Sequence, residues 1–237
     1  MRADSYLANK KLTRSRTEAT TLIQSGQIKV NGVILQKPSV DIKDTDVVEI
    51  LSLSPFVSRG GEKLAGALDQ FNINVTDLTA IDIGSSTGGF TDCLLKRRAR
   101  QVYAVDVGTA QLAESLRTDS RVVIMEQTDI RKLDKIDPQI SLAVIDVSFI
   151  PLSLILPDIY KLLSSGATVV ALVKPQFEVT REQRNKQGVV KKEEDQKAAL
   201  EKVKKIATDL GFTVKGEMES PLLGGEGNRE YLLYLRK

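Results

Sequence analysis

The stretch Asp82-Ile-Gly-Ser-Ser-Thr-Gly-Gly-Phe90 decides the fold of this chain. It follows a short apolar run, residues 78–83, which predicts a buried strand, and it leads into residues 91–98, which predict a helix. A glycine-rich turn between a strand and a helix is where an α/β sheet binds a nucleotide-like ligand. The sequence therefore predicts an α/β domain with a ligand site at this turn.

The glycine spacing of the turn discriminates between ligands. Gly84, Gly88 and Gly89 form the pattern G-x-x-x-G-G, which matches neither the dinucleotide fingerprint nor the phosphate loop, since no lysine follows Gly89. S-adenosylmethionine has no phosphate and needs close backbone approach at its amino-acid end, so the pattern favours this cofactor, with a purely structural corner as the alternative. The residues assigned to the cofactor are Asp82, Gly84, Ser85, Ser86, Thr87, Gly88, Gly89 and Phe90.

Two acidic residues follow the next two predicted strands. Asp106 closes the apolar strand 101–107, where a carboxylate can accept both hydroxyls of an adenosine ribose; the same spacing would suit NAD. Asp129 follows strand 122–125 and is placed to meet the adenine amino group. The alternative for Asp129 is a helix N-cap before Arg131.

Composition excludes several kinds of site. The chain of 237 residues has no histidine and one cysteine, Cys93, so disulfide frameworks, cysteine zinc sites and histidine-dependent nucleophiles are excluded, and we expect no metal. The beginning of the chain lacks the apolar core of a signal peptide. The most apolar stretch, residues 140–157, is interrupted by Asp146, Pro151 and Pro157, so we expect a cytoplasmic protein without membrane contact.

The excess of positive charge lies in the first quarter of the chain. Residues 1–60 hold nine Lys and Arg against six Asp and Glu, whereas residues 61–237 hold 25 of each. Such asymmetry indicates a module that faces nucleic acid, joined to a neutral one. The cations that could contact phosphates, with a solvated helix face as the alternative, are Lys10, Lys11, Arg14, Arg16 and Lys29.

Local patterns divide the chain into two domains. Residues 1–50 predict a small α+β RNA-binding domain, with a helix from an N-cap at Thr13 to about Ser25 and a hairpin around Asn31-Gly32. Residues 51–57 predict a linker, and residues 58–237 predict a doubly wound, mostly parallel, Rossmann-like sheet. The expected strands lie near residues 79–83, 101–106, 122–125, 141–146 and 167–173, with closing strands at 212–218 and 230–235.

Four charged residues fall where chemistry occurs in such a fold. Asp146 ends strand 142–145 and Lys174 ends strand 169–173, and ligands of an open α/β sheet lie outside these carboxyl ends. Lys63 opens the helix before the first strand of the sheet, and Glu230 begins the last strand. Asp146 and Lys174 are therefore predicted site residues, whereas Lys63 and Glu230 would each, taken alone, more often be surface charges.

These stretches together resemble the TlyA/hemolysin A family of ribosomal RNA methyltransferases. The N-terminal part is similar to the RNA-binding module of small-subunit ribosomal protein four, and the rest is similar to an FtsJ-type 2′-O-methyltransferase. The resemblance implies a catalytic Lys-Asp-Lys-Glu tetrad, S-adenosylmethionine as cofactor, and a cytidine of ribosomal RNA, alone or in a ribosomal subunit, as substrate. The tetrad is Lys63, Asp146, Lys174 and Glu230, and Arg59 is counted with the RNA-binding residues. The stretches that carry the resemblance are residues 12–32, 57–63, 82–95, 102–108, 145–150, 172–178 and 226–230.

The implied chemistry assigns Lys174 to the reacting hydroxyl, which it would polarise or deprotonate. Asp146 and Glu230 beside it would favour the charged lysine, whereas burial and Lys63 would favour the neutral form. A base-amino methyltransferase is disfavoured, because Asp146-Val-Ser-Phe149 lacks the prolines of its motif, and a cytosine carbon-5 enzyme is disfavoured, because Cys93 is expected in the core. An RNA-binding assembly factor without catalysis and a membrane-lytic hemolysin are the further alternatives.

Overall fold

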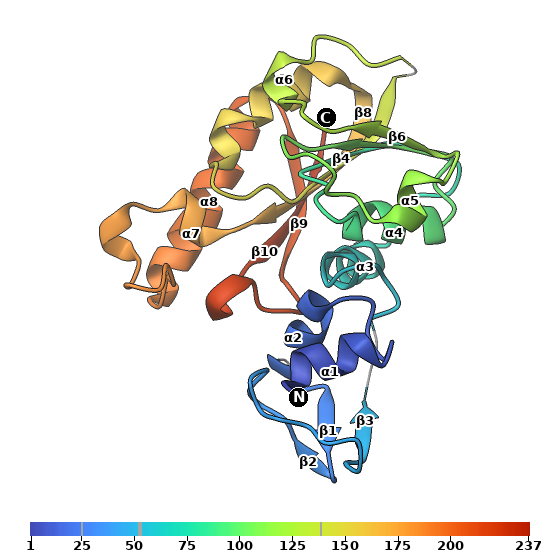
Figure 1. Cartoon of the computed structure of the whole chain (residues 1–237). Coiled ribbons are helices and arrows are strands. Elements are labelled where there is room, and N and C mark those ends of the chain that lie inside the picture. The colour runs from blue at the N-terminus through green and yellow to red at the C-terminus, as the bar shows by residue number, and fades with distance from the viewer. Residues whose placement is uncertain (25, 52–53, 138) are drawn as a thin grey trace. The chain divides into compact units, whose positions relative to one another are not determined.

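The chain forms two compact units, Met1–Pro55 and Phe56–Lys237. The computed structural model describes all residues except 25, 52, 53 and 138, so two residues of the predicted linker 51–57 and the predicted helix end at Ser25 lie outside the described part. Figure 1 labels most of the helices and strands of both units. Each unit has its own core, and each is described by itself below.

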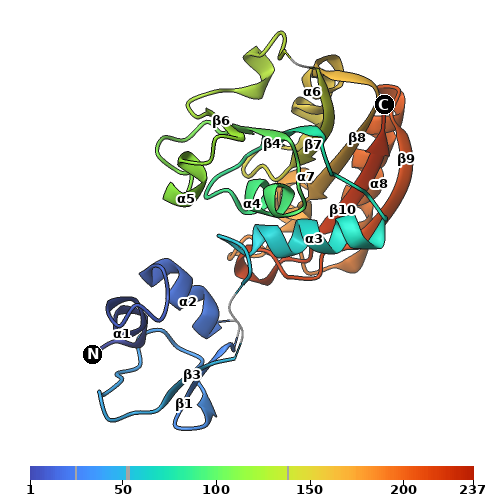
Figure 2. The same cartoon turned by 90° about the vertical axis from the view of Figure 1, so that its right-hand side faces the viewer.

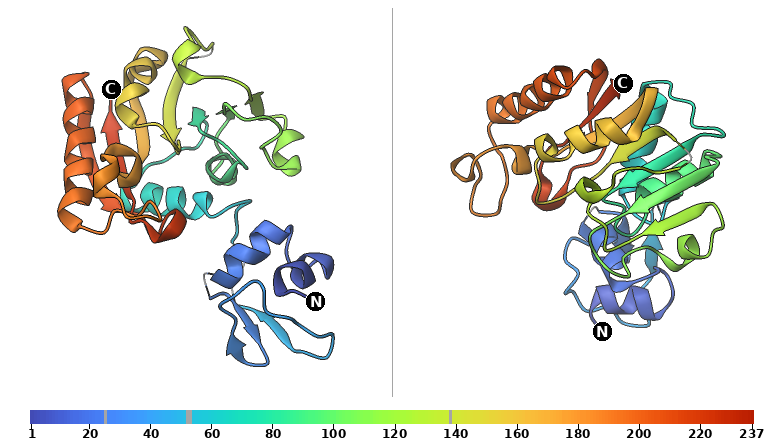
Figure 3. Two further views of the ribbon diagram at one scale, coloured as in Figure 1. Left: turned by 60° about the vertical axis from the view of Figure 1, so that its left-hand side comes forward. Right: turned by 90° about the horizontal axis from the view of Figure 1, so that it is seen from above.

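The N-terminal unit packs two helices on a three-stranded antiparallel sheet (Figure 2, Figure 3). The hairpin turns at Asn31 and Gly32, which both have positive φ, as the Asn-Gly pair predicts. Apolar side chains from both helices and the first strand fill the core, among them Leu7, Ile23 and Ile28. The elements are α1 (Ala3–Asn9), α2 (Arg16–Gln24), β1 (Ile28–Val30), β2 (Val33–Ile34) and β3 (Val48–Ile50), in the sheet order β2-β1-β3.

The start of this unit differs from the prediction. Helix α2 begins at Arg16, and the hydroxyl of Ser15 accepts a hydrogen bond from Glu18 N at 3.1 Å. The predicted N-cap, Thr13, instead donates its hydroxyl to the Ser15 carbonyl at 3.1 Å, so the prediction of Thr13 was wrong. Helix α1 was not predicted, because only seven residues form it and they follow no extended apolar period.

The C-terminal unit contains one seven-stranded sheet in the order β6-β5-β4-β7-β8-β10-β9. Strands β4 to β8 are parallel, whereas β10 runs antiparallel to both β8 and β9. This confirms the predicted doubly wound, mostly parallel sheet. The strands are β4 (Thr79–Ile83), β5 (Gln101–Val105), β6 (Val122–Met125), β7 (Ile140–Ile145), β8 (Leu163–Val173), β9 (Thr213–Glu219) and β10 (Tyr231–Arg236).

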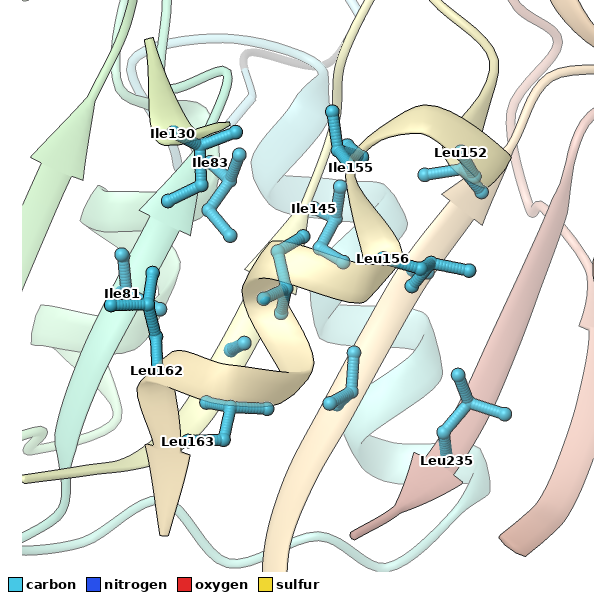
Figure 4. Close-up of a cluster of buried hydrophobic side chains, with 14 of the residues drawn as sticks. Ile81, Ile83, Ile130, Ile145, Leu152, Ile155, Leu156, Leu162, Leu163 and Leu235 are labelled. Carbon is cyan, nitrogen blue, oxygen red and sulfur yellow. The ribbon is translucent and has the colours of Figure 1, made fainter. Parts of the chain in front are cut away.

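Helices cover both faces of this sheet (Figure 1, Figure 2). One face packs against α3 (Gly60–Gln70), α4 (Gly89–Lys96) and α5 (Glu114–Arg117), and the other against α6 (Leu156–Leu162) and α8 (Glu193–Asp209). Figure 4 shows side chains of the second face, with Leu156 and Leu162 of α6 among Ile81, Ile145 and Leu235 of the strands. The central strands are rich in apolar residues because helices cover both of their faces.

Short elements occupy the connections next to the carboxyl ends of the strands. Helix α7 (Pro175–Glu178) follows β8 directly, and the 3₁₀ helix η2 (Leu152–Leu154) lies between β7 and α6. The others are η1 (Ile130–Lys132), η3 (Arg181–Gln183) and η4 (Gly225–Gly227). Within the described residues, no helix has the length and apolar character needed to cross a membrane.

The strand order places a topological switch point between β4 and β7. From β4 the chain winds outward to β5 and β6, and then returns to the other side of β4 to form β7 and β8. The two central strands end side by side, with Ile83 in register with Ile145. Ligands of doubly wound folds bind at this point, so the fold predicts a ligand site at the glycine-rich turn and Asp146.

Candidate active site

The glycine-rich turn and Asp146 meet at the switch point. Asp146 N donates a hydrogen bond to the Ile83 carbonyl at 2.9 Å, and Gly84 N donates to the Val105 carbonyl at 2.9 Å. Gly84 has a φ of +82°, and a Cβ at this position would lie 2.5 Å from the Asp146 carbonyl oxygen. Only glycine therefore allows the ends of the two central strands to approach so closely.

Asp82 ties the turn to the helix that follows it. Its Oδ2 accepts hydrogen bonds from Thr91 N at 2.9 Å and from the Thr91 hydroxyl at 2.7 Å, which joins β4 to the first turn of α4. Its Oδ1 is buried and has no hydrogen-bond partner among the described residues. Burial, assisted by repulsion from Asp146 and Asp106, raises the pKa of Asp82 to about 7.

The raised pKa of Asp82 predicts a pH dependence of stability. The folded protein keeps this proton up to about pH 7, whereas the unfolded chain loses it near its ordinary pKa of 3.8. Rising pH should therefore lower the free energy of unfolding between these values, by up to about 1.4 kcal/mol per pH unit, and have no further effect through this group above about pH 7. Urea unfolding of the wild type and of Asp82→Asn from pH 5 to 8 checks this, because only the wild type should show the decline. Parallel curves for the two proteins would refute it.

A polar cavity of about 260 Å³ opens beside the turn. Its walls come from the beginning of α3, the turn after β4, the ends of β7 and β8, and the loop before η4. Every predicted cofactor residue of the turn except Gly88 lines it. The lining residues are Ser58, Arg59, Gly60, Lys63, Asp82, Gly84, Ser85, Ser86, Thr87, Gly89, Phe90, Asp146, Ser148, Lys174, Leu223, Gly224 and Gly225.

Gly88 supports the turn from behind. It has a φ of +92° and precedes the first residue of α4. A Cβ at Gly88 would lie 2.3 Å from the end of the Leu116 side chain and 2.7 Å from that of Leu112. The sequence led us to expect that Gly88 allows the backbone to approach the ligand directly, whereas in the structure Gly88 packs closely against Leu112 and Leu116.

Two lysine–carboxylate ion pairs stand in this part of the site. Lys63 Nζ lies 2.5 Å from Glu230 Oε2, and Lys174 Nζ lies 2.7 Å from Asp146 Oδ1. Lys174 also donates a hydrogen bond to the Ser148 hydroxyl at 2.9 Å. The four predicted tetrad residues are thus brought together as two separate pairs. The structure pairs Glu230 with Lys63, whereas the sequence led us to expect Glu230 beside Lys174.

Glu230 lies behind the cavity wall. Its side chain is 2% exposed, and Gln176 Nε2 donates to its Oε1 at 3.4 Å. A Cβ on Gly224 would lie 2.0 Å from the same oxygen, so the loop before η4 passes directly over the carboxylate. Arg59 also holds this loop, because its guanidinium donates a hydrogen bond to the Leu223 carbonyl at 2.5 Å. Arg59 therefore lines the cavity of the C-terminal unit, whereas the other predicted RNA-binding cations belong to the N-terminal unit.

A second, more apolar cavity of about 520 Å³ adjoins the first. The two share Gly84, Ser86, Asp146 and Ser148. Both oxygens of Asp106 are fixed by backbone donors, Oδ2 by Ser86 N at 2.8 Å and Oδ1 by Gly108 N at 2.7 Å. The remaining lining residues are Ile83, Val105, Asp106, Val107, Gln111, Thr128, Asp129, Ile130, Arg131, Val147, Phe149, Ile150 and Ile155.

Asp129 is the helix N-cap that the sequence offered as the alternative to a cofactor role, and it also lines the second cavity. It caps η1 by accepting a hydrogen bond from Arg131 N at 3.0 Å. The Arg131 guanidinium lies 2.6 Å from Asp129 Oδ2 and lowers the pKa of this carboxyl to about 2. A ligand amino group at Asp129 would therefore share the carboxylate with Arg131.

Two residues of the second cavity and its wall were missed. Glu126 follows β6 and accepts hydrogen bonds from Ala110 N at 2.8 Å and Gln111 N at 2.9 Å. It also forms an ion pair with Arg117. These contacts hold in place the segment after Asp106 that forms part of the cavity wall. An acid directly after a strand was the available indication, and we used it only for Asp106 and Asp129. Phe149, three residues after Asp146, is 91% exposed and has a φ of +66°.

The cations of the N-terminal unit are not all available to a ligand. Arg16 lies 2.9 Å from the buried carboxylate of Asp4, which Arg2 also contacts at 3.1 Å, and Lys10 lies 2.9 Å from Asp44. Arg16 therefore holds α2 against α1. The other three predicted cations are Lys11 and Arg14, which are exposed, and Lys29 on β1, which is partly exposed.

Comparison with known proteins matches each of the two units to a family. Residues 56–237 match the FtsJ-like methyltransferase family, and residues 1–48 match the S4 domain. The chain is 42% identical over 239 residues to the 16S/23S rRNA (cytidine-2′-O)-methyltransferase TlyA of Mycobacterium tuberculosis, covering 99% of this chain and 89% of the relative. It is 41% identical over 237 residues to Hemolysin A of Brachyspira hyodysenteriae, covering 99% of each. Among solved structures, "Putative hemolysin from Streptococcus thermophilus" superimposes with a TM-score of 0.81 at 45% identity, covering 100% of this chain and 88% of that one.

Proposed function

The chain belongs to the FtsJ-like methyltransferase family, in the group that contains TlyA and hemolysin A, and from this we propose that it methylates the ribose 2′-hydroxyl of a cytidine in ribosomal RNA with S-adenosylmethionine. The observation that carries the proposal is the junction of the two cavities. A polar cavity with the Lys174–Asp146 pair in its wall adjoins an apolar cavity with a fixed carboxylate, and the glycine turn lies where they meet. A ribosomal substrate would place the protein in the cytoplasm.

The residues present suit S-adenosylmethionine. Asp106 would accept the ribose hydroxyls, since each of its oxygens has a lone pair left after one backbone hydrogen bond. Asp129 would meet the adenine amino group, and apolar side chains such as Val105 and Ile150 would cover the base. The unpartnered Oδ1 of Asp82 and the backbone of residues 84–87 would face the amino-acid end. When bound, the cofactor supplies an electrophilic methyl group on a sulfonium.

Lys174 would act on the oxygen that receives the methyl group. Its ammonium is held by Asp146 and by the Ser148 hydroxyl, which leaves its third donor for the ribose 2′-oxygen. The hydroxyl becomes acidic as its bond to carbon forms, so a positioned donor can stabilise the oxygen without a strong base at the start. The proton would then leave through the Lys174–Asp146 pair.

Lys63 and Glu230 would shape the polar cavity rather than transfer the proton. Their ion pair is almost fully buried, and it anchors the beginning of α3 to the beginning of β10. Lys63 lines the cavity while Glu230 supports it from behind, so Lys63 could also contact a phosphate or hydroxyl of the substrate. Their contribution to the transfer step should be smaller than that of Lys174.

Phe149 offers a surface for the substrate base. Its exposed ring lies 5.1 Å from the ring of Phe177, and it stands at the rim of the second cavity, three residues after Asp146. Bases of unpaired nucleotides stack on exposed aromatic rings, at about 1–3 kcal/mol per base. A nucleotide turned out of the RNA could thus place its ribose at Lys174 and its base at Phe149.

The proposal is tested by incubating the protein with ribosomal subunits and S-adenosylmethionine labelled in the methyl group. We expect label in ribose, in RNA that resists alkaline cleavage at the modified nucleotide. Label in a base would contradict the proposal. Tight RNA binding without any label would instead support an assembly factor, the second candidate, which the S4 domain alone would explain.

Removal of the N-terminal unit separates binding from transfer. A chain that starts at Phe56 should lose at least about tenfold in affinity for ribosomal RNA at physiological salt, and its affinity should depend less steeply on salt, since fewer phosphates are neutralised. Binding of S-adenosylmethionine should be unchanged, because both cavities lie in the C-terminal unit. Filter binding across a salt series, with calorimetry for the cofactor, provides the measurement. A truncated protein that binds and modifies ribosomal RNA as well as the full chain would contradict this division.

A further inference from the structure

Two segments that follow the neighbouring strands β7 and β8 contact each other at several side chains. The segment after β7 carries Asp146, Ser148 and Phe149, and the segment from the end of β8 through α7 carries Lys174 and Phe177. Lys174 contacts Asp146 at 2.7 Å and Ser148 at 2.9 Å, and the two phenylalanine rings lie 5.1 Å apart. All side chains proposed to meet the substrate ribose and base thus depend on how these two segments are held together.

Glu178, the last residue of α7, closes this series of contacts. It is 6% exposed, and its Oε1 accepts a hydrogen bond from Leu152 N at 2.7 Å. Leu152 is the first residue of η2, and the preceding Pro151 provides no side-chain cap, so this N–H would otherwise be unpaired. The bond joins the end of α7 to the end of the segment that begins at Asp146.

The hydrogen bond from Leu152 N satisfies one N–H group, but burying the Glu178 carboxyl for it costs stability. The second oxygen of Glu178 is buried without a hydrogen-bond partner in the described part of the chain, and burial raises the pKa of this carboxyl. Lys202 Nζ donates to the Glu178 carbonyl oxygen at 2.9 Å, which leaves the carboxyl itself to Leu152. A buried carboxyl with an unsatisfied oxygen costs stability, so stability alone does not account for it.

We propose that Glu178 is a positioning residue for methyl transfer, which holds the loop from Asp146 to Leu152 against α7 so that Ser148 and Phe149 stay beside Lys174. It acts through the Leu152 N–H and does not reach either cavity. The inference rests on the proposed function, because the loop matters for transfer only if Lys174 acts on the ribose. A weaker hold should raise the KM for RNA and lower the transfer rate together.

Three variants test this hydrogen bond between Glu178 and Leu152, which we call the tether. Glu178→Met removes the acceptor at similar length, Glu178→Gln keeps one acceptor oxygen, and Lys202→Met removes a bond to the same residue without touching Leu152. In Glu178→Met we expect the Leu152 amide to exchange with solvent at least about tenfold faster, and transfer at saturating cofactor to fall at least about tenfold. Glu178→Gln and Lys202→Met should stay within about threefold of the wild type in both measurements.

The readouts distinguish failure of this inference from failure of the proposed function. Unchanged Leu152 exchange or unchanged transfer in Glu178→Met, with an active wild type, would overturn the inference. A wild type that transfers no methyl group to ribose would overturn the proposed function, and the exchange data would still decide whether the tether exists. If Glu178→Met does not fold, Glu178→Asp shortens the side chain by one methylene and should break the same bond with the same two effects.

Discussion

Replacing Lys174 by alanine is expected to lower single-turnover methyl transfer to ribosomal RNA by at least about 10²-fold. The variant loses the donor that Asp146 and Ser148 hold in the wall of the polar cavity, and no histidine in the chain could replace it. Asp146→Ala should have a loss of similar size, because Lys174 then loses its closest ion-pair partner. Rapid-quench assays with labelled cofactor provide the rate, and calorimetry provides the cofactor affinity. Near-normal transfer by Lys174→Ala would mean that alignment of the reactants alone drives the reaction.

The other ion pair provides the matched control for this experiment. Lys63 and Glu230 are about as close as Lys174 and Asp146, and the two lysines are about equally buried, but the Glu230 side chain is 2% exposed whereas that of Asp146 is 23% exposed. Removal of one partner leaves an unpaired buried charge, which typically costs about 3–5 kcal/mol. Lys63→Ala and Glu230→Ala should therefore lower the melting temperature clearly, whereas Lys174→Ala should affect transfer far more than stability. The reverse order would contradict the roles assigned to the two pairs.

The central strands of the sheet could be predicted closely because they are buried on both faces. The predicted strand 79–83 coincides with β4, in which all five residues are buried. Residues 122–125 coincide with β6 through their apolar composition, although this edge strand is only partly buried. The exception is β8, which begins at Leu163 instead of near residue 167, because Ser164, Ser165 and Gly166 have the composition of a turn. Leu163 nevertheless pairs with Ile140, across an irregularity in the register that no local pattern indicates.

The sequence could predict those site residues whose position is determined by the end of a strand. It could not predict those whose role depends on hydrogen bonds to backbone groups far away in the sequence. Asp146 and Lys174 follow apolar strands, so the sheet brings them to one edge. Glu126 follows β6 and Glu178 ends α7, but their importance depends on which N–H groups face them, those of residues 110–112 and of Leu152. These partners lie 14 to 26 residues away, and no spacing in the sequence reveals them.

Close approach of the two central strands makes Gly84 the most sensitive glycine of the site. In Gly84→Ala the new Cβ would lie 2.5 Å from the Asp146 carbonyl oxygen and 2.9 Å from its carbonyl carbon, and backbone cannot rotate away as a side chain can. The turn and the Asp146 segment must separate, and both cavities include residues of each. We expect the affinity for S-adenosylmethionine to fall at least about tenfold, since the walls that should enclose it move apart.

Gly166→Ala is the control that isolates this clash. Gly166 also has a positive φ, +74° against +82° for Gly84, but nothing lies within 4 Å of a Cβ added there. Both variants should therefore lose stability through the strained backbone, about 1 kcal/mol each, and only Gly84→Ala should also lose cofactor affinity and melt at a much lower temperature. Calorimetry and thermal unfolding of the two variants provide the comparison. Equal cofactor affinity in both would show that the strand ends can separate without disturbing the site, and the cofactor role assigned to the glycine turn would then be wrong.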